Sequence, residues 1–376
     1  MYVTGIGRTK FGVLNSTLPE LAYQAILNAL KDADLSVRDL DAIYVANAYG
    51  ELFQNQTHIS SLISSLLPEL RIPIVRIEAA CASGGAALYN GLISLSKFKK
   101  IMVLGMEKMT GINNAKSTMY IATSGDRILD QKEGLIFPAS YALIAQQHML
   151  RYGTTLDDLA LISLKDHRNA NLNELAHFYQ KIVDLETIKN SPIVCSPLRL
   201  FDCCPISDGA AALIVSKNKR TSRDIEIIAS SMATDYISLA QRIELTSFKS
   251  AKIAANEAYE QAKVKPSDID IAEVHDCFTI AELIAMEDLG FCEPGESKNL
   301  IREGRTTMEG DLPVNTDGGL KADGHPIGAT GIAQVIEVVT QLRGEAGKRQ
   351  VKEAKIGLVH NIGAVGGTAV IHILKK

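Results

Sequence analysis

Apolar residues along the chain form short continuous runs that alternate with stretches in which they recur every three or four positions. Continuous runs of this length are typical of buried strands, and the helical recurrence is typical of helices. The first half predicts strands at 41–48, 73–80, 99–107 and 208–216. It predicts helices at 18–35, 57–67 and 81–98. Strands and helices in alternation predict an α/β protein with parallel strands and crossover helices on both faces of the sheet.

Residues 108 to 203 interrupt this alternation. They contain separate helical pieces at 138–153 and 155–170. Thr155 and Asp158 stand at the start of the second piece, where they can form a capping box. We interpret this segment as an insertion or lid, after which the strand pattern resumes.

The second half repeats the order of elements seen in the first. It predicts strands at 224–233, 268–274, 355–360 and 367–375, and helices at 247–262, 279–290 and 328–344. In both halves a turn of small residues leads into a long apolar helix and then a buried strand. We interpret this as an internal duplication of one α/β unit, although two unrelated α/β lobes would give a similar pattern. The expected units are 1–107 with 204–222, the insertion 108–203, and 223–376.

Composition and charge narrow the classes of partner and compartment. The 376 residues include 39 basic and 43 acidic side chains, a net charge of -4, and no basic run of five. This balance argues against nucleic acid or an acidic membrane surface as the main partner. No apolar stretch reaches the roughly 18 residues that span a bilayer, and the start lacks the pattern of a signal peptide. Six cysteines without framework spacing fit a reducing compartment, so we expect a cytoplasmic protein.

Cys81, in "EAACASGG", is the first candidate for chemistry. It stands where a strand gives way to a helix, and the unpaired N–H groups of a helix N-terminus favour a thiolate. The small residues around it leave room for an acyl group. The alternative is a small buried cysteine in a tight helix contact.

His325, in "KADGHPIGATG", occupies the corresponding place of the second half. If the halves pack about a pseudo-twofold axis, Cys81 and His325 face each other as a nucleophile and its base. The alternative is a histidine whose ring caps a turn.

The C-terminal "VHNIGAVGGTAVI" runs from a strand into glycine-rich backbone at Gly363, Gly366 and Gly367. Bare N–H groups of such a turn can form an oxyanion hole, although these glycines could equally close a tight loop. The polar His360 and Asn361 at the strand end favour a site.

"HDCF" places His275 and Cys277 two residues apart at a strand end, where ligands gather in parallel sheets. Zinc is the competing interpretation, because cysteine and histidine are its ligands. No CxxC or HxxxH pair accompanies them, so we expect no metal. Asp276 faces the other way and is interpreted as structural.

Taken together and in order, these motifs resemble the thiolase superfamily over essentially the whole chain. The segments that carry the resemblance are "GMEKM", "SDGAAALIV", "HDCF", "GHPIGATG" and the final glycine-rich turn. The best-known thiolases have NEAF in place of "HDCF" and a terminal Cys-x-Gly in place of Asn361-Ile362-Gly363. Both departures occur in the sterol-carrier-protein type and in similar archaeal and bacterial thiolases. The missing terminal cysteine makes Cys277 the natural replacement for the proton-shuttling acid.

The resemblance implies two duplicated halves in a five-layer αβαβα fold with an inserted loop domain, and a homodimer or homotetramer. It implies that Cys81 takes an acyl group, which a second acyl-CoA attacks through its deprotonated α-carbon. In that reaction His325 deprotonates Cys81, Cys277 exchanges the α-proton, and His275 stabilises the enolate oxygen. Backbone N–H groups of Cys81 and Gly363 would form a second oxyanion hole, with Asn361 and His360 in support.

Coenzyme A esters are the expected substrates, and no further cofactor is expected because no Rossmann or Walker fingerprint is present. CoA should lie along the insertion 108–203, where basic side chains could hold its phosphates: Arg127, Lys132, Arg151, Lys165, His167, Arg168 and Arg199. The chain length leaves no room for a sterol-carrier domain. This favours a stand-alone biosynthetic enzyme that condenses two acetyl-CoA to acetoacetyl-CoA. Archaeal enzymes of this kind make a zinc-containing OB-fold scaffold protein and a hydroxymethylglutaryl-CoA synthase hypothetical partners.

Other functions fit parts of this pattern. A longer-chain 3-oxoacyl-CoA thiolase would use the same residues. A ketoacyl synthase lacks a second catalytic cysteine, so Cys277 argues against it. A non-catalytic acyl-CoA-binding subunit would not need to retain four reactive side chains, and nothing beyond Cys81 and His325 supports a cysteine hydrolase.

Overall fold

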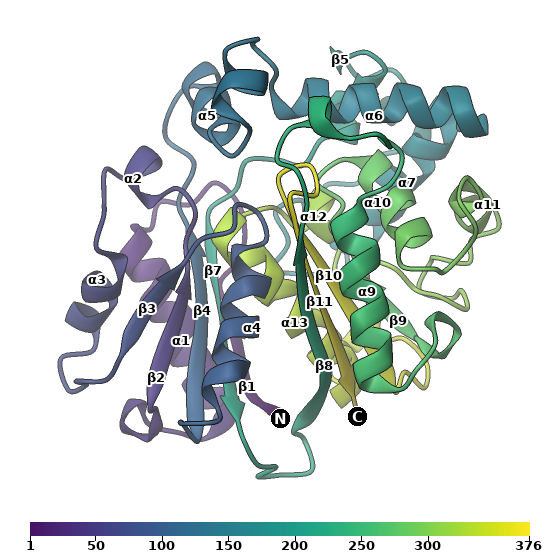
Figure 1. The fold of residues 1–376 in the computed structure, drawn as a ribbon. Coiled ribbons are helices and arrows are strands. Elements are labelled where there is room, and N and C mark those ends of the chain that lie inside the picture. Colours follow the sequence, from purple (N-terminus) through teal and green to yellow (C-terminus); the bar gives the residue numbers. More distant parts are fainter.

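A computed structural model describes residues 1–376 and contains one mixed sheet of nine strands in the order β3-β2-β4-β7-β1-β8-β11-β10-β9 (Figure 1). The N-terminal strands are β1 (Tyr2–Arg8), β2 (Ala42–Ala46), β3 (Ile74–Ile77), β4 (Lys100–Glu107) and β7 (Gly209–Ser216). The C-terminal strands are β8 (Ile225–Thr234), β9 (Ile271–Glu273), β10 (Ile356–Gly363) and β11 (Thr368–Lys375). Every strand predicted from the apolar runs is present.

The pairing of the strands repeats from one half to the other. In the N-terminal half β2 lies parallel to β3 and β4, and β4, β7 and β1 then pair antiparallel. In the C-terminal half β9 lies parallel to β10, and β10, β11 and β8 pair antiparallel. At the position equivalent to β3, Val314 makes an isolated parallel bridge to Ala272. The predicted duplication is therefore confirmed in the topology, and the halves join where β1 meets β8.

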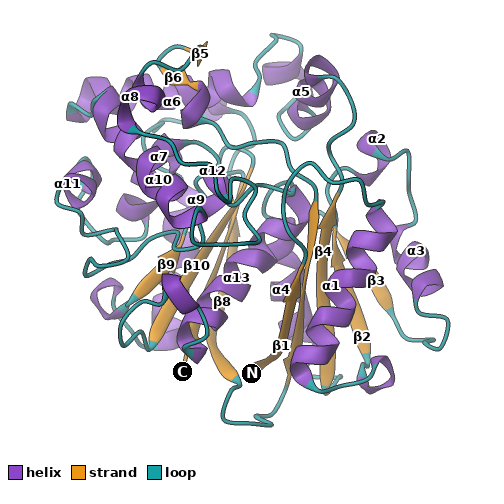
Figure 2. Cartoon of the chain, turned by 180° about the vertical axis from the view of Figure 1, so that it is seen from behind, coloured by secondary structure: helices purple, strands orange, loops and turns teal.

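Helices form three layers that enclose the two halves of the sheet. The central layer is α4 (Ser83–Ser94) with α13 (Ile327–Arg343), which lie between the two halves (Figure 2). The outer layers are α1 (Leu18–Ala33) with α3 (Ile59–Leu66), and α9 (Lys249–Ala262) with α10 (Thr279–Asp288). This is the expected five-layer αβαβα arrangement of a thiolase fold.

The core follows these layers. Leu88 of α4 and Ile332 of α13 belong to one apolar cluster between the two halves, and Leu21 and Ile26 of α1 belong to another on the outer face of the N-terminal half. Helix α1 is fixed at its start by the Thr17–Glu20 capping box. Burying these faces supplies the main stabilisation of the layers.

The segment 108–203 lies beyond the carboxyl ends of β4 and β10, at the top of Figure 1. Its helices are α5 (Asn114–Ala122), η2 (Arg127–Gln131), α6 (Phe137–Tyr152), α7 (Leu156–Ala170) and α8 (Leu185–Lys189), followed by β5 (Ile193–Cys195), β6 (Leu198–Arg199) and η3 (Leu200–Asp202). Helix α7 begins with the predicted capping box, in which Thr155 and Asp158 bond each other's backbone N–H groups. The segment thus covers the strand ends that carry the candidate site.

Several short helices were not predicted from the sequence: α2 (Gly50–Phe53), α11 (Ser297–Arg302), α12 (Gly319–Ala322), and the single turns η1 (Val37–Asp39), η4 (Leu239–Gln241), η5 (Pro266–Asp268) and η6 (Gly347–Arg349). Elements of one turn are too short to produce a recurring apolar face.

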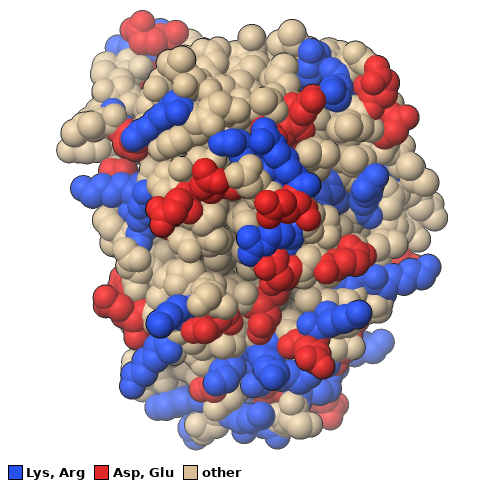
Figure 3. Space-filling view, turned by 90° about the vertical axis from the view of Figure 1, so that its right-hand side faces the viewer, with Lys and Arg blue, Asp and Glu red and all other residues tan.

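Basic and acidic side chains are interspersed on the face shown in Figure 3, in keeping with the nearly balanced charge of the sequence. None of the helices has both the length and the apolar composition that a membrane crossing requires.

Candidate active site

Cys81 lies between β3 and α4, where the chain enters the central helix layer. The preceding Ala80 adopts a left-handed conformation with φ of 50°, and its N–H donates to the Glu78 carboxylate at 2.6 Å. Only 8% of Cys81 is exposed. A Cβ on Gly84 would lie 2.9 Å from the backbone nitrogen of Gly331, so the small residues after Cys81 allow the two central helices to touch.

His325 lies between α12 and α13, and Thr330 fixes the tautomer of its ring. His325 Nδ1 is 2.7 Å from Thr330 Oγ1, and the Thr330 hydroxyl donates to the Pro326 carbonyl at 3.1 Å. With the hydroxyl proton assigned to the Pro326 carbonyl, Thr330 Oγ1 accepts from His325 Nδ1–H. The neutral imidazole then has a bare Nε2, which has no hydrogen-bond partner and can accept a proton.

His275 follows β9, and Asn361 of β10 fixes its tautomer in the opposite sense. Asn361 Oδ1 accepts from the Gly85 N–H at 3.1 Å, which orients the amide. Its Nδ2 lies 3.0 Å from the Cys81 carbonyl and 3.3 Å from His275 Nδ1. An amide nitrogen only donates, so His275 Nδ1 accepts and the ring proton is on Nε2. This Nε2–H also has no partner and is free to donate to a bound oxygen.

The three side chains meet, as the duplication predicts. The Cys81 Sγ and one ring nitrogen each of His275 and His325 lie within 4.8 Å of one another. The two imidazole rings are 5.3 Å apart and nearly perpendicular, at 85°. A proton acceptor and a hydrogen-bond donor therefore flank the same thiol, which is the arrangement that acyl transfer requires.

Cys277 lines the same cavity as Cys81 and is 6% exposed. It lies opposite Cys204, whose N–H donates to the Cys277 carbonyl at 3.0 Å. Tyr141 of the insertion lines the same cavity. All four residues predicted to be catalytic are thus brought together.

The resting site is uncharged, which corrects one expectation from the sequence. Burial raises the pKa of the Cys81 thiol to about 12, although the N–H groups of Ala364 and Cys81 itself lower it. Burial also raises the pKa of Cys277 well above its ordinary value. The predicted lowering of the Cys81 pKa at the helix N-terminus is therefore wrong, because the loss of solvation outweighs it.

The histidines are neutral for the same reason. Burial lowers the pKa of His325 to about 3, and burial with the neighbouring His325 and His360 lowers the pKa of His275 well below its ordinary value. Cys81 and His325 are therefore both neutral in this structure, and a thiol is a much weaker nucleophile than a thiolate.

The residues predicted to support the site surround this group. His360 Nδ1 accepts from the His275 N–H at 3.5 Å, a long contact. Gly363 packs so closely that a Cβ would lie 2.6 Å from the Ala79 carbonyl. The N–H that hydrogen-bonds the resting Cys81 sulfur from this turn belongs to Ala364, one residue after Gly363.

Three buried carboxylates, each from one of the sequence motifs, hold the loops around the site by accepting their backbone N–H groups. Asp276 accepts the N–H groups of Leu320 at 2.7 Å and Lys321 at 3.2 Å, and so fixes the helix α12 that precedes His325. This confirms its structural interpretation. Glu107 of "GMEKM" and Asp208 of "SDGAAALIV" likewise accept several backbone N–H groups from the loops after β2 and β4.

Sequence reasoning missed Thr330, Tyr141 and Ala364. Thr330 follows His325 by five residues within one motif, so a threonine one turn into the helix was a usable signal. Tyr141 and Ala364 reach the site from the insertion and the C-terminal turn, and no local pattern marks them.

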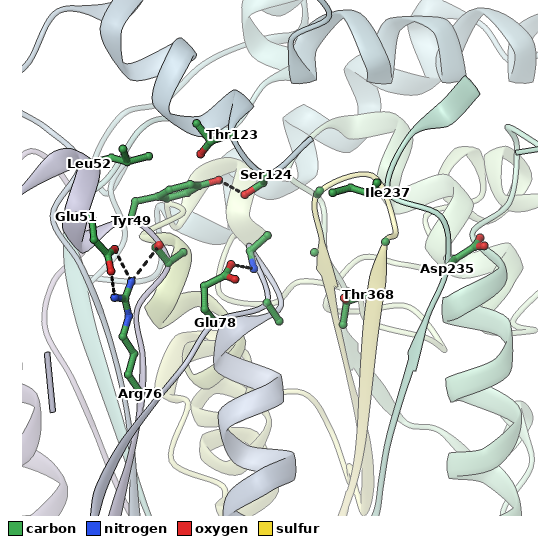
Figure 4. Close-up of a pocket in the computed structure, with 16 residues that line it drawn as sticks. Tyr49, Glu51, Leu52, Arg76, Glu78, Thr123, Ser124, Asp235, Ile237 and Thr368 are labelled. Carbon is green, nitrogen blue, oxygen red and sulfur yellow. Dashed lines mark hydrogen bonds and ion pairs between the residues drawn. The ribbon is translucent and has the colours of Figure 1, made fainter. Parts of the chain in front are cut away.

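An apolar cavity of about 210 Å³ opens onto both Cys81 and Cys277. Its lining includes Met109, Thr118, Ile121, Phe137, Pro138, Tyr141, Cys203, Cys204, Ile206, Phe278 and Ile327. A larger and more polar pocket of about 590 Å³ is drawn in Figure 4. It lies beside the apolar cavity, since Ala364 lines both. In this second pocket Tyr49 bonds Ser124 and Arg76 pairs with Glu51.

The seven basic residues proposed for CoA phosphates divide into three groups. Lys165 and His167 are buried: the Lys165 ammonium pairs with Asp166 at 3.0 Å and Glu282 at 2.8 Å, and the His167 ring stacks on Phe178. These two cannot reach a phosphate in solvent, so their assignment is wrong. Arg151 pairs with Glu244, and Arg199 donates to the Ser191 carbonyl. The exposed residues without an ion pair are Arg127, Lys132 and Arg168.

Two groups of side chains are close enough to share a cation. One is Cys81 with His275 and His325, and the other is Asp166 with Asp276 and Glu282. In the first, the free His275 nitrogen carries a proton and is not a ligand in that tautomer. In the second, the Lys165 ammonium already neutralises two of the carboxylates. The donor chemistry of both groups therefore fits hydrogen bonding and ion pairing better than a metal.

Comparisons with known proteins agree with this geometry. The family model described as "Thiolase, N-terminal domain" matches residues 1–219, and "Thiolase C-terminal domain-like" matches residues 231–376. The chain is 46% identical to an acetyl-CoA acetyltransferase of Methanothermobacter thermautotrophicus, covering 100% of this chain and 99% of the relative. It is 41% identical to an acetyl-CoA acetyltransferase of Methanocaldococcus jannaschii, covering 99% and 98%.

A solved structure, the Ltp2-ChsH2(DUF35) aldolase, superimposes with a TM-score of 0.85 at 26% identity, covering 99% of this chain and 97% of that one. The matches span both halves of the fold, including Cys81, Cys277 and His325. The chain belongs to the thiolase family of acyltransferase enzymes.

Proposed function

We propose that this thiolase catalyses the reversible Claisen condensation of two acetyl-CoA molecules to acetoacetyl-CoA and CoA. The observation that carries the proposal is the opposite tautomers of two histidines around one thiol. His325 offers a bare Nε2 to the Cys81 proton, and His275 offers an Nε2–H to a carbonyl oxygen. The naming of the archaeal relatives as acetyl-CoA acetyltransferases supports acetyl-CoA as substrate.

In the first half-reaction the Cys81 proton moves to His325, and the thiolate attacks the acetyl carbonyl. The C–S bond to CoA breaks, and the leaving CoA sulfur takes the proton of Cys277. The products are acetyl-Cys81, free CoA, a protonated His325 and a Cys277 thiolate. The resting thiol form of Cys277 suits this step, because it begins as a proton donor.

In the second half-reaction the Cys277 thiolate removes an α-proton from a second acetyl-CoA. The His275 Nε2–H stabilises the enolate oxygen that forms. The enolate carbon attacks acetyl-Cys81, and the Cys81 sulfur leaves and regains its proton from His325. Both thiols and both imidazoles return to their starting protonation states, so the cycle needs no further reactant.

A longer-chain 3-oxoacyl-CoA thiolase is the second candidate. The cavity of about 210 Å³ beside the cysteines is apolar and has room for more than a two-carbon acyl group. Comparing acetoacetyl-CoA with longer 3-oxoacyl-CoA esters distinguishes the two, because an acetyl-specific site would lose kcat/KM as the chain grows.

We also propose that Arg127 and Lys132 hold the CoA phosphates. Both are exposed, and they lie in sequence between Ile121 and Phe137, which line the cavity. A homodimer or homotetramer, a zinc-containing OB-fold scaffold protein and a hydroxymethylglutaryl-CoA synthase are proposed partners. The similar Ltp2-ChsH2(DUF35) aldolase, whose name joins two components, supports an association with a second protein.

The test is thiolysis of acetoacetyl-CoA by free CoA, with acetyl-CoA followed by mass spectrometry. We expect turnover by the native protein, and acetyl addition to Cys81. Cys81→Ala should abolish both turnover and acetylation. Cys277→Ala should lose turnover by a factor of about 10²–10⁴, the usual contribution of a general acid or base. A native protein that does not cleave acetoacetyl-CoA, even with the proposed partners supplied, would refute the function.

A further inference from the structure

Tyr141 of α6 carries a hydroxyl from the insertion to the cavity that Cys81 and Cys277 line. It is 1% exposed, and its ring stacks on Phe278 with centroids 4.5 Å apart and an interplanar angle of 23°. The ring of Phe248 packs against it edge-on at 6.3 Å. Aromatic contacts on two sides leave the Tyr141 ring little freedom, so the position of its hydroxyl is fixed.

The Tyr141 hydroxyl donates to the Ala364 carbonyl at 2.9 Å. Tyr141 and Cys277 line the same cavity, and the nearby Tyr141 hydroxyl acts to lower the pKa of the Cys277 thiol against the larger effect of burial. A phenol has one proton and can accept as well as donate. While its proton is directed to Ala364, the hydroxyl oxygen can accept from the Cys277 S–H.

When Cys277 gives up its proton, its thiolate becomes a stronger hydrogen-bond acceptor than the Ala364 carbonyl. A hydrogen bond to a charged group is worth more than one to a neutral carbonyl. The phenolic proton can then turn from Ala364 to the Cys277 sulfur without movement of the ring. Few other polar groups surround this sulfur, because its cavity is lined mainly by apolar side chains.

We propose that Tyr141 is a positioning residue for proton transfer at Cys277. Its hydroxyl holds the resting thiol and stabilises the thiolate by donating to it during the reaction. The inference rests on the proposed function, because it names the group that supports the acid–base cysteine of that reaction. It also gives the insertion a role in catalysis, since Tyr141 belongs to α6 and lines the cavity that holds Cys277.

The same hydroxyl connects the two cysteines through the C-terminal turn. The carbonyl of Ala364 accepts from Tyr141, and the N–H of Ala364 hydrogen-bonds the Cys81 sulfur. A variant that loses the hydroxyl could therefore disturb both thiols, so the experiment must measure the two separately.

The experiment compares Tyr141→Phe with Tyr259→Phe. Tyr259 is a matched control, because it is buried in α9 and its hydroxyl donates to the Leu289 carbonyl at 2.8 Å, away from the cavity. The chemistry of Cys277 is followed by exchange of the α-protons of acetyl-CoA in D2O. Acylation of Cys81 is followed with an acetyl aryl thioester, whose leaving thiolate needs no proton from Cys277.

We expect Tyr141→Phe to slow α-proton exchange by about tenfold or more, the effect of losing a hydrogen bond to a charged group. In this variant the exchange rate should rise with pH over a higher pH range than in the native protein. The reason is that a less stabilised Cys277 thiolate has a higher pKa. Acylation by the aryl thioester should stay within about twofold of native, and Tyr259→Phe should match native in both assays.

A third variant separates chemistry from packing. Tyr141 replaced by 3-fluorotyrosine keeps the shape and the hydroxyl but is a stronger donor, so the exchange profile should move to lower pH. Native rates and pH dependence in Tyr141→Phe, or equal losses in exchange and acylation, would overturn the role of Tyr141. A native protein that neither exchanges protons nor cleaves acetoacetyl-CoA would overturn the proposed function as well.

Discussion

At the scale of single residues, the chemistry depends on which nitrogen of each histidine carries the proton. His325 and His275 have similar surroundings, in that both are buried and lie beside the same thiol. Their hydrogen-bond partners differ, since Thr330 accepts from one ring and Asn361 donates to the other. In these tautomers the free nitrogen of His325 can accept a proton and that of His275 can donate a hydrogen bond, although the residue type is the same.

Thr330→Val tests this assignment. Valine has a similar shape but no acceptor for His325 Nδ1–H, so the neutral ring can take the wrong tautomer and lose the bare Nε2. We expect the rate of Cys81 acetylation to fall about tenfold, with little change in the thermal midpoint. Thr340→Val removes a hydroxyl that bonds the Ile336 carbonyl farther along the same helix, and it should leave the rate unchanged. Equal rates in both variants would contradict the tautomer assignment.

At the scale of elements, the long strands and helices follow from the sequence because each buries a face with a clear period. Helix α13 and strand β7 coincide closely with their predicted ranges. The turns that hold the candidate site residues could not be predicted from the sequence, because groups far away in the chain fix their conformation. Helix α12 has four residues, and the carboxylate of Asp276 fixes it from another strand end.

Strand β11 contains a buried histidine whose burial lowers the stability of the fold at acidic pH, an effect that the strand's sequence does not reveal. His372 is fully buried within "GTAVIHILK", where its Nε2 lies 3.3 Å from the Gly85 carbonyl and its Nδ1 has no partner. Burial lowers the pKa of His372 from 6.5 to about 4. The unfolded chain therefore binds more protons between these values. The stabilisation from keeping His372 neutral is complete above about pH 6.5 and is lost as pH falls toward 4.

His372→Gln should remove this pH dependence. Between pH 6.5 and 4 the native protein should lose about 1.4 kcal/mol of unfolding free energy per pH unit more than the variant. Urea denaturation across this range measures the difference. His58→Gln serves as the control, because His58 is exposed and its replacement should give the native slope. A native slope in His372→Gln would show that His372 does not contribute.

At the scale of the whole molecule, the site exists because two copies of one unit meet at their central helices. The duplication could be predicted from the repeated order of elements, and so could the meeting of Cys81 with His325. The contacts of Tyr141 and Asn361 could not, because they depend on how the insertion and β10 settle against helices far away in sequence. The part of the site that follows from symmetry was thus predictable, and the part set by asymmetric packing was not.

Gly331→Ala tests whether the contact between the halves also sets the chemistry. A Cβ at this position would lie 2.2 Å from Asn361 Oδ1 and 2.5 Å from the Gly85 nitrogen. Alanine favours a helix, but the forced separation should outweigh this and lower the free energy of unfolding by about 1–3 kcal/mol. Because Asn361 holds the His275 ring, α-proton exchange should fall more than acylation of Cys81 by an aryl thioester. Thr340→Ala, on the same helix but away from the contact, should leave stability and both rates near native. If Gly331→Ala lost stability while exchange and acylation fell equally, the contact would support the fold without orienting His275.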